Sequence, residues 1–205
     1  MLNEVKNEAQ SWQADKSRRM KRQIVEAAIT CLHQHGYHKA SIKKISQISS
    51  FSQGALQHHF PTKQDLMVHV LERLLKKSIN LTIEWIEGLG SHRARFSQLT
   101  RIMWHKQIRS PEFLAMVEIL VAARTEMPLK ERLKPSYDHY MQEMTVSISR
   151  HFSHSNLSPE TVAMLARVSR CLLSGFISYD GVFMSEEDME EFVSDWALFL
   201  EKAIC

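Results

Sequence analysis

The stretch SIKKISQISSFSQGALQHHFPTKQDL, residues 41–66, decides the fold. Ile42, Ile45 and Ile48 recur at intervals of three, which is the spacing of one face of a helix. Ser41 stands directly before them and is a good N-cap for that helix. The serine-rich SSFS that follows turns the chain. The pattern therefore predicts a short helix followed by a tight turn.

A second short helix is expected from Gln53 to His59. It ends there because Pro61 cannot continue it. Leu56 and Phe60 lie one helical turn apart and can anchor this helix on a core. The other side chains are amides and imidazoles, namely those of Gln53, Gln57, His58 and His59. A surface so rich in donors and acceptors suits either a solvated face or the edges of base pairs.

Helical patterns flank this pair on both sides. Upstream, apolar residues recur at helical spacing over residues 24–35, and Gly36 stops that helix. Downstream, Thr62 and Asp65 form a capping-box pattern that starts a longer helix extending to about Glu87. Two short helices joined by a tight turn and braced by a longer one outline a helix-turn-helix unit.

The composition of the whole chain favours an all-α fold, and we expect about nine helices along it. The 205 residues include only 6 Gly and 5 Pro, so helix breakers are scarce. No apolar run approaches the ~20 residues that cross a bilayer, and the N-terminus lacks the apolar core of a signal peptide. The three cysteines are odd in number and far apart, which argues against a disulfide framework. We therefore expect a cytoplasmic protein.

The formal net charge of +3 conceals an asymmetry along the chain. Residues 1–65 contain 10 Lys and Arg against 5 Asp and Glu, whereas residues 66–205 contain 16 against 18. A basic N-terminal third on a near-neutral body favours a module that meets a polyanion, although a solvated basic face has the same composition.

These features resemble the DNA-binding domain of the tetracycline-repressor (TetR/AcrR) family of bacterial regulators. The resemblance runs from Arg19 to Glu72 and includes IVEAAITCLHQHGY, SIKKISQIS, SQGALQHHF and PTKQDL in that order. It implies a flexible N-terminal arm over residues 1–17. A helix-turn-helix domain over 18–66 would follow, with its motif at about 41–60, and then a ligand-binding and dimerisation domain over 67–205.

The same resemblance implies a function. It describes a homodimeric repressor that binds a roughly palindromic operator in double-stranded DNA. A small apolar or amphipathic effector would release it. The alternative that stays open is a regulator that binds DNA constitutively, with a protein partner or no ligand.

Family DNA contacts transfer to this chain position by position. Base contacts fall on Gln53, Gly54, Ala55, Gln57 and His59. Phosphate contacts fall on Ser41, Lys43, Lys44, Ser52, His58 and Lys63. Gln pairs bidentately with adenine, and Ala55 is small enough to lie against a thymine methyl. Gln57 departs from the family, which usually has an aromatic residue at that position.

The resemblance also implies a small-molecule pocket and a dimer interface in the C-terminal domain. Candidate pocket residues are Trp85, Met103, Trp104, Met116, Tyr137, Tyr140, Met141, Met144 and Phe176. Candidate interface residues on the last two helices are Leu165, Ser169, Leu172, Leu173, Phe176, Phe192, Trp196, Phe199 and Leu200. The alternative for both sets is that they fill the core of the chain itself.

Catalytic and metal chemistry find no support in the sequence. His58 and His59 are neighbours, so their side chains diverge by about 100° on a helix and do not chelate one ion easily. No nucleophile–base constellation or phosphate-cradling loop appears. We therefore expect no enzyme activity, no metal and no cofactor. An enzyme on a helical scaffold remains a remote third possibility.

Overall fold

The structure is a computed structural model that describes residues 2–89, 95–152, 157–178 and 183–204. Within these ranges the chain forms nine α-helices, which confirms the all-α prediction. Their bounds are α1 Leu2–Lys39, α2 Ile42–Ser49, α3 Gln53–His59, α4 Lys63–Gly88, α5 Arg95–Met103, α6 Pro111–Ala122, α7 Met127–His151, α8 Pro159–Gly175 and α9 Glu186–Ile204. No helix in the described ranges is long and apolar enough to cross a membrane.

The chain divides into two compact units. Unit 1 contains residues Met1–Leu71 together with Ala115–Arg132, and unit 2 contains Glu72–Leu114 and Leu133–Cys205. Helices α4, α6 and α7 each pass from one unit to the other. The division predicted from the sequence, with one boundary between residues 66 and 67, differs from this one because it leaves 115–132 with the C-terminal domain.

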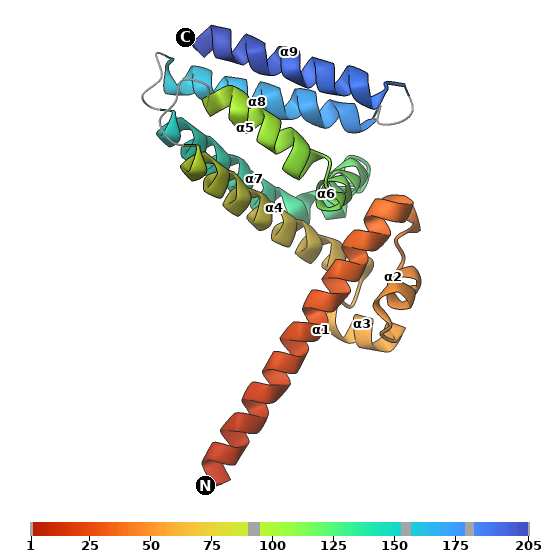
Figure 1. The fold of residues 1–205 in the computed structure, drawn as a ribbon. Coiled ribbons are helices and arrows are strands. Elements are labelled where there is room, and N and C mark those ends of the chain that lie inside the picture. Colours follow the sequence, from red (N-terminus) through yellow and green to blue (C-terminus); the bar gives the residue numbers. More distant parts are fainter. Residues whose placement is uncertain (1, 90–94, 153–156, 179–182, 205) are drawn as a thin grey trace. The chain divides into compact units, whose positions relative to one another are not determined.

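The core of unit 1 forms where α1, α2, α3 and the start of α4 meet. In Figure 1, α2 and α3 lie beside the C-terminal half of α1. The apolar stripe of α1 is buried, as are single anchors on each of the short helices and the first turns of α4. These residues are Ile24, Val25, Ala28, Cys31, Leu32, Ile45, Leu56, Leu66, Met67 and Val70. The apolar residues predicted on the helix over residues 24–35 therefore form part of this core, whereas Ile42 and Ile48 of α2 are half-buried.

Helix α1 is longer than expected at its N-terminal end and is interrupted near its C-terminal end. It begins at Leu2, so residues 2–17, expected to form a flexible arm, are helical. At the other end Gly36 interrupts the helical geometry with φ 73° and ψ 169°. This conformation suits glycine because a side chain would be strained there. Gly36 therefore interrupts the helix where the sequence predicts its end, although helical residues continue to Lys39.

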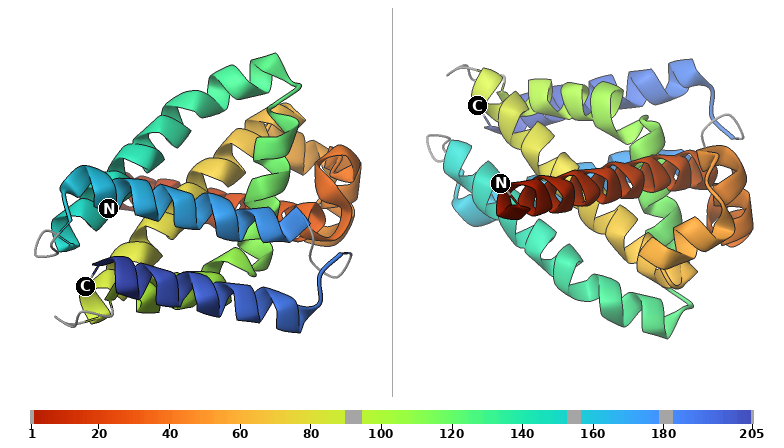
Figure 2. Two further views of the ribbon diagram at one scale, coloured as in Figure 1. Left: turned by 90° about the horizontal axis from the view of Figure 1, so that it is seen from above. Right: turned by 90° about the horizontal axis from the view of Figure 1, so that it is seen from below.

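Unit 2 is a layered helical body whose last two helices run side by side (Figures 1 and 2). The indole Nε1 of Trp196 on α9 donates to Ser169 Oγ on α8 at 3.0 Å. On the other side of α9, Arg101 of α5 donates to Ser194 at 3.0 Å. Helix α9 is therefore held by hydrogen bonds to both of its neighbours.

Serine caps also start the helices α8 and α9. Ser158 Oγ accepts the Thr161 N–H at 3.3 Å at the start of α8. Ser185 Oγ accepts the Asp188 N–H at 3.1 Å at the start of α9, and the Ser185 hydroxyl donates back to the Asp188 carboxylate at 2.6 Å. These contacts satisfy N–H groups that a helix start leaves unpaired.

A π-helical segment, η1 (Trp104–Ile108), follows α5. The sequence pattern does not predict it. It buries Trp104 and directs the indole N–H to Glu190 of α9 at 2.8 Å. Arg109, directly after it, also pairs with Glu190 at 3.3 Å. The segment thus ties the α5–α6 connection to α9.

Candidate nucleic-acid interface and interior cavity

The two short helices of unit 1 are capped by the serines that the sequence singled out. Ser41 Oγ accepts the Lys44 N–H at 3.2 Å, and Ser52 Oγ accepts the Ala55 N–H at 3.2 Å. Between the helices, Ser50 takes the left-handed conformation with φ 61°, which reverses the chain. Because a cap uses one lone pair of a hydroxyl oxygen, both capping serines keep capacity for a further hydrogen bond.

Helix α3 presents a polar face and buries an apolar one. Leu56 is fully buried, whereas Gln53, Gly54, Gln57 and His58 are exposed. A Cβ added at Gly54 would meet no atom within 4 Å, so the backbone there faces open space. The predicted base-reading positions at 53, 54 and 57 therefore share an accessible surface, and Ala55 is half-buried beside them.

His59 lies apart from that surface. It is half-buried, and its Nε2 lies 3.1 Å from the Met20 sulfur on α1. Burial lowers the pKa of His59, and the neighbouring charges of His58 and Lys21 lower it further. In this position the ring packs between helices and supports α3 from within the unit.

Lys63 is also turned inward. Its ammonium Nζ donates to the Tyr37 carbonyl oxygen at 2.6 Å and lies 3.9 Å from the centre of the Tyr37 ring. Burial lowers the pKa of Lys63, while the negative charge of Glu126 acts in the opposite direction. The side chain expected to meet a phosphate thus secures the end of α1. Lys43 is exposed, and Lys44 is half-buried.

A cluster around Tyr37 joins the two chain segments of unit 1. The Tyr37 N–H donates to Glu118 Oε2 at 2.8 Å, and its hydroxyl donates to Glu126 Oε2 at 2.9 Å. The Glu118 carboxylate also lies 3.1 Å from where a Gly36 Cβ would be. Sequence reasoning missed this cluster, because the two glutamates lie more than 80 residues away along the chain.

The predicted pocket residues divide between two hollows in unit 2. Met103 and Met144 line a hollow of about 330 Å³, part of it open to solvent, between α4, α5, α7 and α8. Trp104 and Phe176 line a second, of about 260 Å³, near η1. Neither lining includes the other candidates, Trp85, Met116, Tyr137, Tyr140 and Met141. Met116 belongs to unit 1, and Tyr140 is buried.

The predicted dimer residues also divide into two groups. Ser169, Leu173, Phe176 and Leu200 are buried within the chain itself, so its own core already covers them. Leu165, Leu172 and Trp196 are half-buried. Phe192 and Phe199 keep 39% and 54% of their surface exposed.

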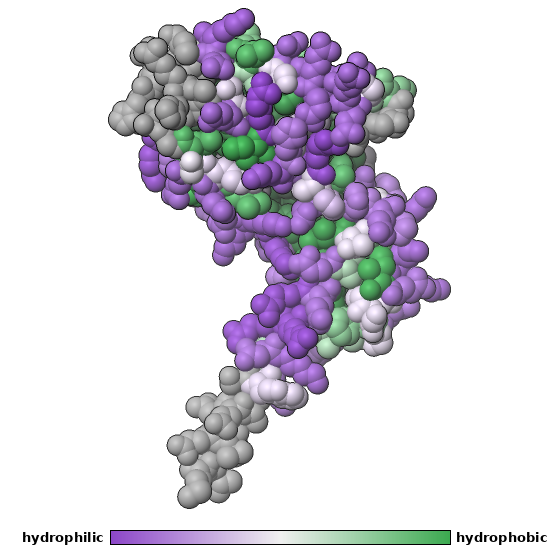
Figure 3. All heavy atoms as spheres, viewed as in Figure 1, coloured by the Kyte–Doolittle hydropathy of each residue, from purple (hydrophilic) through white to green (hydrophobic). Residues whose placement is uncertain are grey.

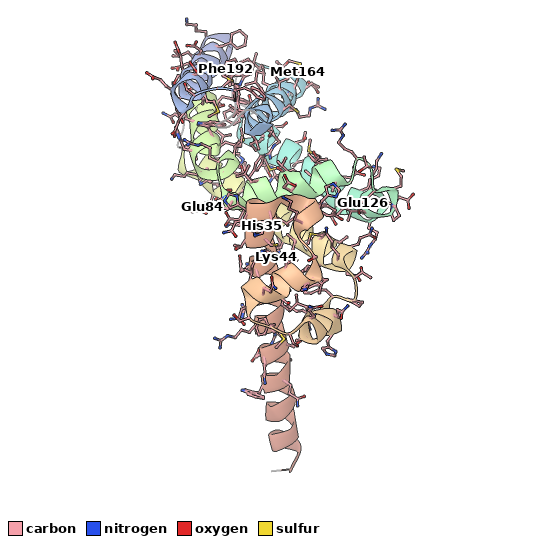
Figure 4. All side chains as sticks on the ribbon, turned by 90° about the vertical axis from the view of Figure 1, so that its right-hand side faces the viewer. His35, Lys44, Glu84, Glu126, Met164 and Phe192 are labelled. Carbon is pink, nitrogen blue, oxygen red and sulfur yellow. The ribbon has the colours of Figure 1, made fainter. Side chains whose placement is uncertain are left out.

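The exposed apolar side chains of α8 and α9 include three that the sequence reading did not select, Met164, Val168 and Leu198. Met164 on α8 and Phe192 on α9 are labelled in Figure 4, and the view in Figure 3 shows apolar atoms among polar ones over this part of unit 2. The two helices thus have one apolar face turned inward and a second turned to solvent.

Comparison with known proteins identifies the family of the N-terminal domain. Residues 24–70 match the family described as bacterial regulatory proteins, tetR family, and the match covers α2, α3 and the adjoining parts of α1 and α4. The matched domain belongs to the TetR family. Its transcriptional repressor relative AcnR from Corynebacterium efficiens is 30% identical over 108 residues, which are 49% of this chain and 57% of that protein. The chain thus spans little more than half the length of this relative.

Solved structures of transcriptional regulators share the fold well beyond the matched domain. A putative TetR-family transcriptional regulator from Mesorhizobium loti has a TM-score of 0.71 at 16% identity, covering 92% of this chain and 97% of that one. A putative transcriptional regulator from Saccharomonospora viridis, in complex with choline, has a TM-score of 0.67 at 18% identity, covering 87% and 95%. At these identities the likeness establishes the fold. The relatives named here are regulators, which agrees with the expectation that this TetR-family chain is not an enzyme.

Proposed function

We propose that this TetR-family protein is a sequence-specific DNA-binding transcriptional regulator of the cytoplasm, acting as a homodimeric repressor. The observation that carries the proposal is the α3 surface. Its exposed side chains are two amides and an imidazole, and one buried leucine anchors the helix from beneath. A solvated helix face has no need of this combination, whereas a major groove admits an α-helix and offers partners for every one of these groups.

Base reading is assigned to the open end of α3. The amides of Gln53 and Gln57 are placed to pair with base edges, and Gly54 allows the backbone to approach closely. Around this surface, Ser41, Ser52, Lys43, Lys44 and His58 provide donors for backbone phosphates, which position a protein on DNA without reading its sequence. A phosphate contact by Lys63 would require its ammonium to leave Tyr37.

Replacing Gln53 by alanine tests this assignment. DNA fragments retained by the pure protein would first be sequenced to define the operator. Binding of the Gln53→Ala protein to the operator and to each of its single base-pair variants would then be measured. We expect a loss of about 1–3 kcal/mol that is confined to one base pair, where the preference relaxes. An equal loss on every sequence would refute base reading at Gln53. Gln142→Ala, at an exposed glutamine of α7, is the matched control.

The dimer would form through the solvent-facing apolar surface of α8 and α9. Met164, Val168, Leu198 and Phe199 lie on it, and a contact between copies would remove them from water. A two-fold dimer carries two copies of α3 related by symmetry, so its operator should be roughly palindromic.

A small molecule is the proposed effector. The described part of unit 2 contains an apolar hollow lined by Met103, Met144 and Phe96, and such linings adapt to varied apolar ligands. The choline complex of the Saccharomonospora viridis relative is one instance of a small molecule held by this fold. An effector that binds the repressor better off DNA than on it would release the operator.

A further inference from the structure

We propose that the hollow between α4, α5, α7 and α8 binds a small organic acid, with Arg170 holding its carboxylate and the apolar wall holding its body. The proposal rests on the proposed function, since it names the chemical class of the effector. Its site lies wholly within unit 2.

Three of the four helices around the hollow contribute apolar side chains, and Ala166 is the one on α8. Helix α5 contributes Phe96, Leu99 and Met103, and α7 contributes Met144 and Ile148. The volume of about 330 Å³ includes space that is open to solvent, so the enclosed part of the hollow is smaller. Such a space favours the compact body of a short aliphatic or aryl-alkyl acid over a long chain.

Arg170 introduces a positive charge into this apolar wall. It is the ionisable residue among the described residues that line the hollow, and none of those residues is acidic. Its Nη2 is buried and meets no hydrogen-bond acceptor in the described parts of the chain. The guanidinium lies over the Tyr140 ring at 5.2 Å from the ring centre, which attracts the charge but leaves the Nη2 hydrogens unpaired.

Thr82 provides a second unpaired group on the same lining. The residue is only 2% exposed, and its Oγ1 has no hydrogen-bond partner in the described residues. The neighbouring hydroxyls differ, because Thr100 donates to the Phe96 carbonyl at 2.8 Å and Ser169 donates to Leu165 and accepts from Trp196. The unpaired polar atoms of this lining are thus donors that one ligand can satisfy.

These donors select for a negative ligand. A buried donor without an acceptor is costly, and a charged one far more so. A carboxylate has two oxygens that can accept from the Arg170 fork and from the Thr82 hydroxyl together. A cationic ligand would meet like charge, and a neutral alcohol would leave the Arg170 charge uncompensated.

Matched acid and alcohol pairs provide the test. Octanoate with 1-octanol, and 3-phenylpropanoate with 3-phenyl-1-propanol, would be titrated calorimetrically into the full-length protein, the Arg170→Met variant and the Arg167→Met control. Arg167 lies on the same helix but is exposed. We expect each acid to bind at least about tenfold more tightly than its alcohol, because hydrogen bonds to charged groups carry this preference. Arg170→Met should abolish it, and Arg167→Met should retain it.

Three results would overturn the inference. These are failure of both acids to bind, equal affinities of acid and alcohol, or an acid preference that survives in Arg170→Met. If Arg170→Met does not fold, Arg170→Lys replaces it. That variant keeps the charge and loses the planar fork, so its acid preference should be reduced but present, and an undiminished preference would count against a fork-held carboxylate.

Operator binding would be measured separately on the same preparations. A protein that binds its operator but no acid refutes this inference and leaves the proposed function intact. A protein that binds acids through Arg170 but no DNA refutes the proposed function and leaves the acid site intact.

Discussion

Replacing Lys63 by methionine separates a structural role of this lysine from a role in DNA binding. In the structure its ammonium donates to the Tyr37 carbonyl at 2.6 Å and lies 3.9 Å from the Tyr37 ring centre. Methionine keeps much of the length and the apolar contact but removes the charge and the donor. A lysine that serves only a phosphate would leave the free protein as stable as before when replaced.

The contacts set the size of the expected loss. A hydrogen bond from a charged donor contributes about 1.5–3 kcal/mol, and a cation–π contact at a partly exposed site adds about 0.5–1 kcal/mol. Burial lowers the pKa of Lys63, so part of this gain is already offset by the desolvation of the ammonium. We expect Lys63→Met to lower the free energy of unfolding by about 1–2 kcal/mol. For a chain of this size, each kcal/mol lowers Tm by about 2–4 °C.

Two measurements on one protein decide the matter. Urea or thermal unfolding without DNA reports the structural role, and the salt dependence of operator binding reports the phosphate role, at about one unit of slope per contact in each half-site. Lys43→Met, at an exposed lysine of α2, is the control that should lower the slope and leave stability unchanged. A Lys63→Met protein as stable as the parent but with a lowered slope would refute the structural role.

The remaining predictions concern the turn, the α4 cap and the dimer. Ser50→Gly should raise the free energy of unfolding in urea by about 0.5–1 kcal/mol, since φ 61° strains serine but not glycine; a less stable variant would contradict this. The hydrogen bonds from Thr62 hold the pKa of Asp65 below its ordinary value. Asp65 therefore stabilises the fold above pH about 4, and its advantage over Asp65→Asn should disappear as the pH falls below that value. Phe199→Glu should sediment as a monomer. Its helical content should be unchanged, because Phe199 is 54% exposed in the single chain. Val146→Glu on α7 is the control and should remain a dimer, whereas a dimeric Phe199→Glu protein would place the interface elsewhere.

Local chemistry made much of the fold predictable from the sequence. Ser41 caps α2 where its pattern indicates, and Gly36 breaks α1 with the positive φ that glycine permits. A cap or a break depends on residues within one helical turn, so it can be read from a short stretch. The same holds for the buried anchor Leu56 and the exposed amides on α3.

Contacts between distant segments were the part that periodicity could not predict. An apolar stripe shows that a helix buries one face, but it does not show which other segment covers that face. The sequence therefore places Leu200 and Phe199 in one interface, although Leu200 is buried within the chain and Phe199 is exposed. The inward position of Lys63 depends on Tyr37, 26 residues away. Arg170 did leave a signal, since it interrupts the stripe that includes Ala166 and Leu173 on α8.

The Tyr37 cluster bears on whether the proposed DNA-binding end of this chain can be transplanted. Unit 1 is assembled from two stretches, Met1–Leu71 and Ala115–Arg132. A fragment ending at Leu71 would lose Glu118 and Glu126, the acceptors for the N–H and the hydroxyl of a buried tyrosine. The N-terminal part is therefore not an interchangeable cassette. A chimera that joins the N-terminal part of this chain to the C-terminal domain of another protein must therefore also include the α6–α7 segment, residues 115–132.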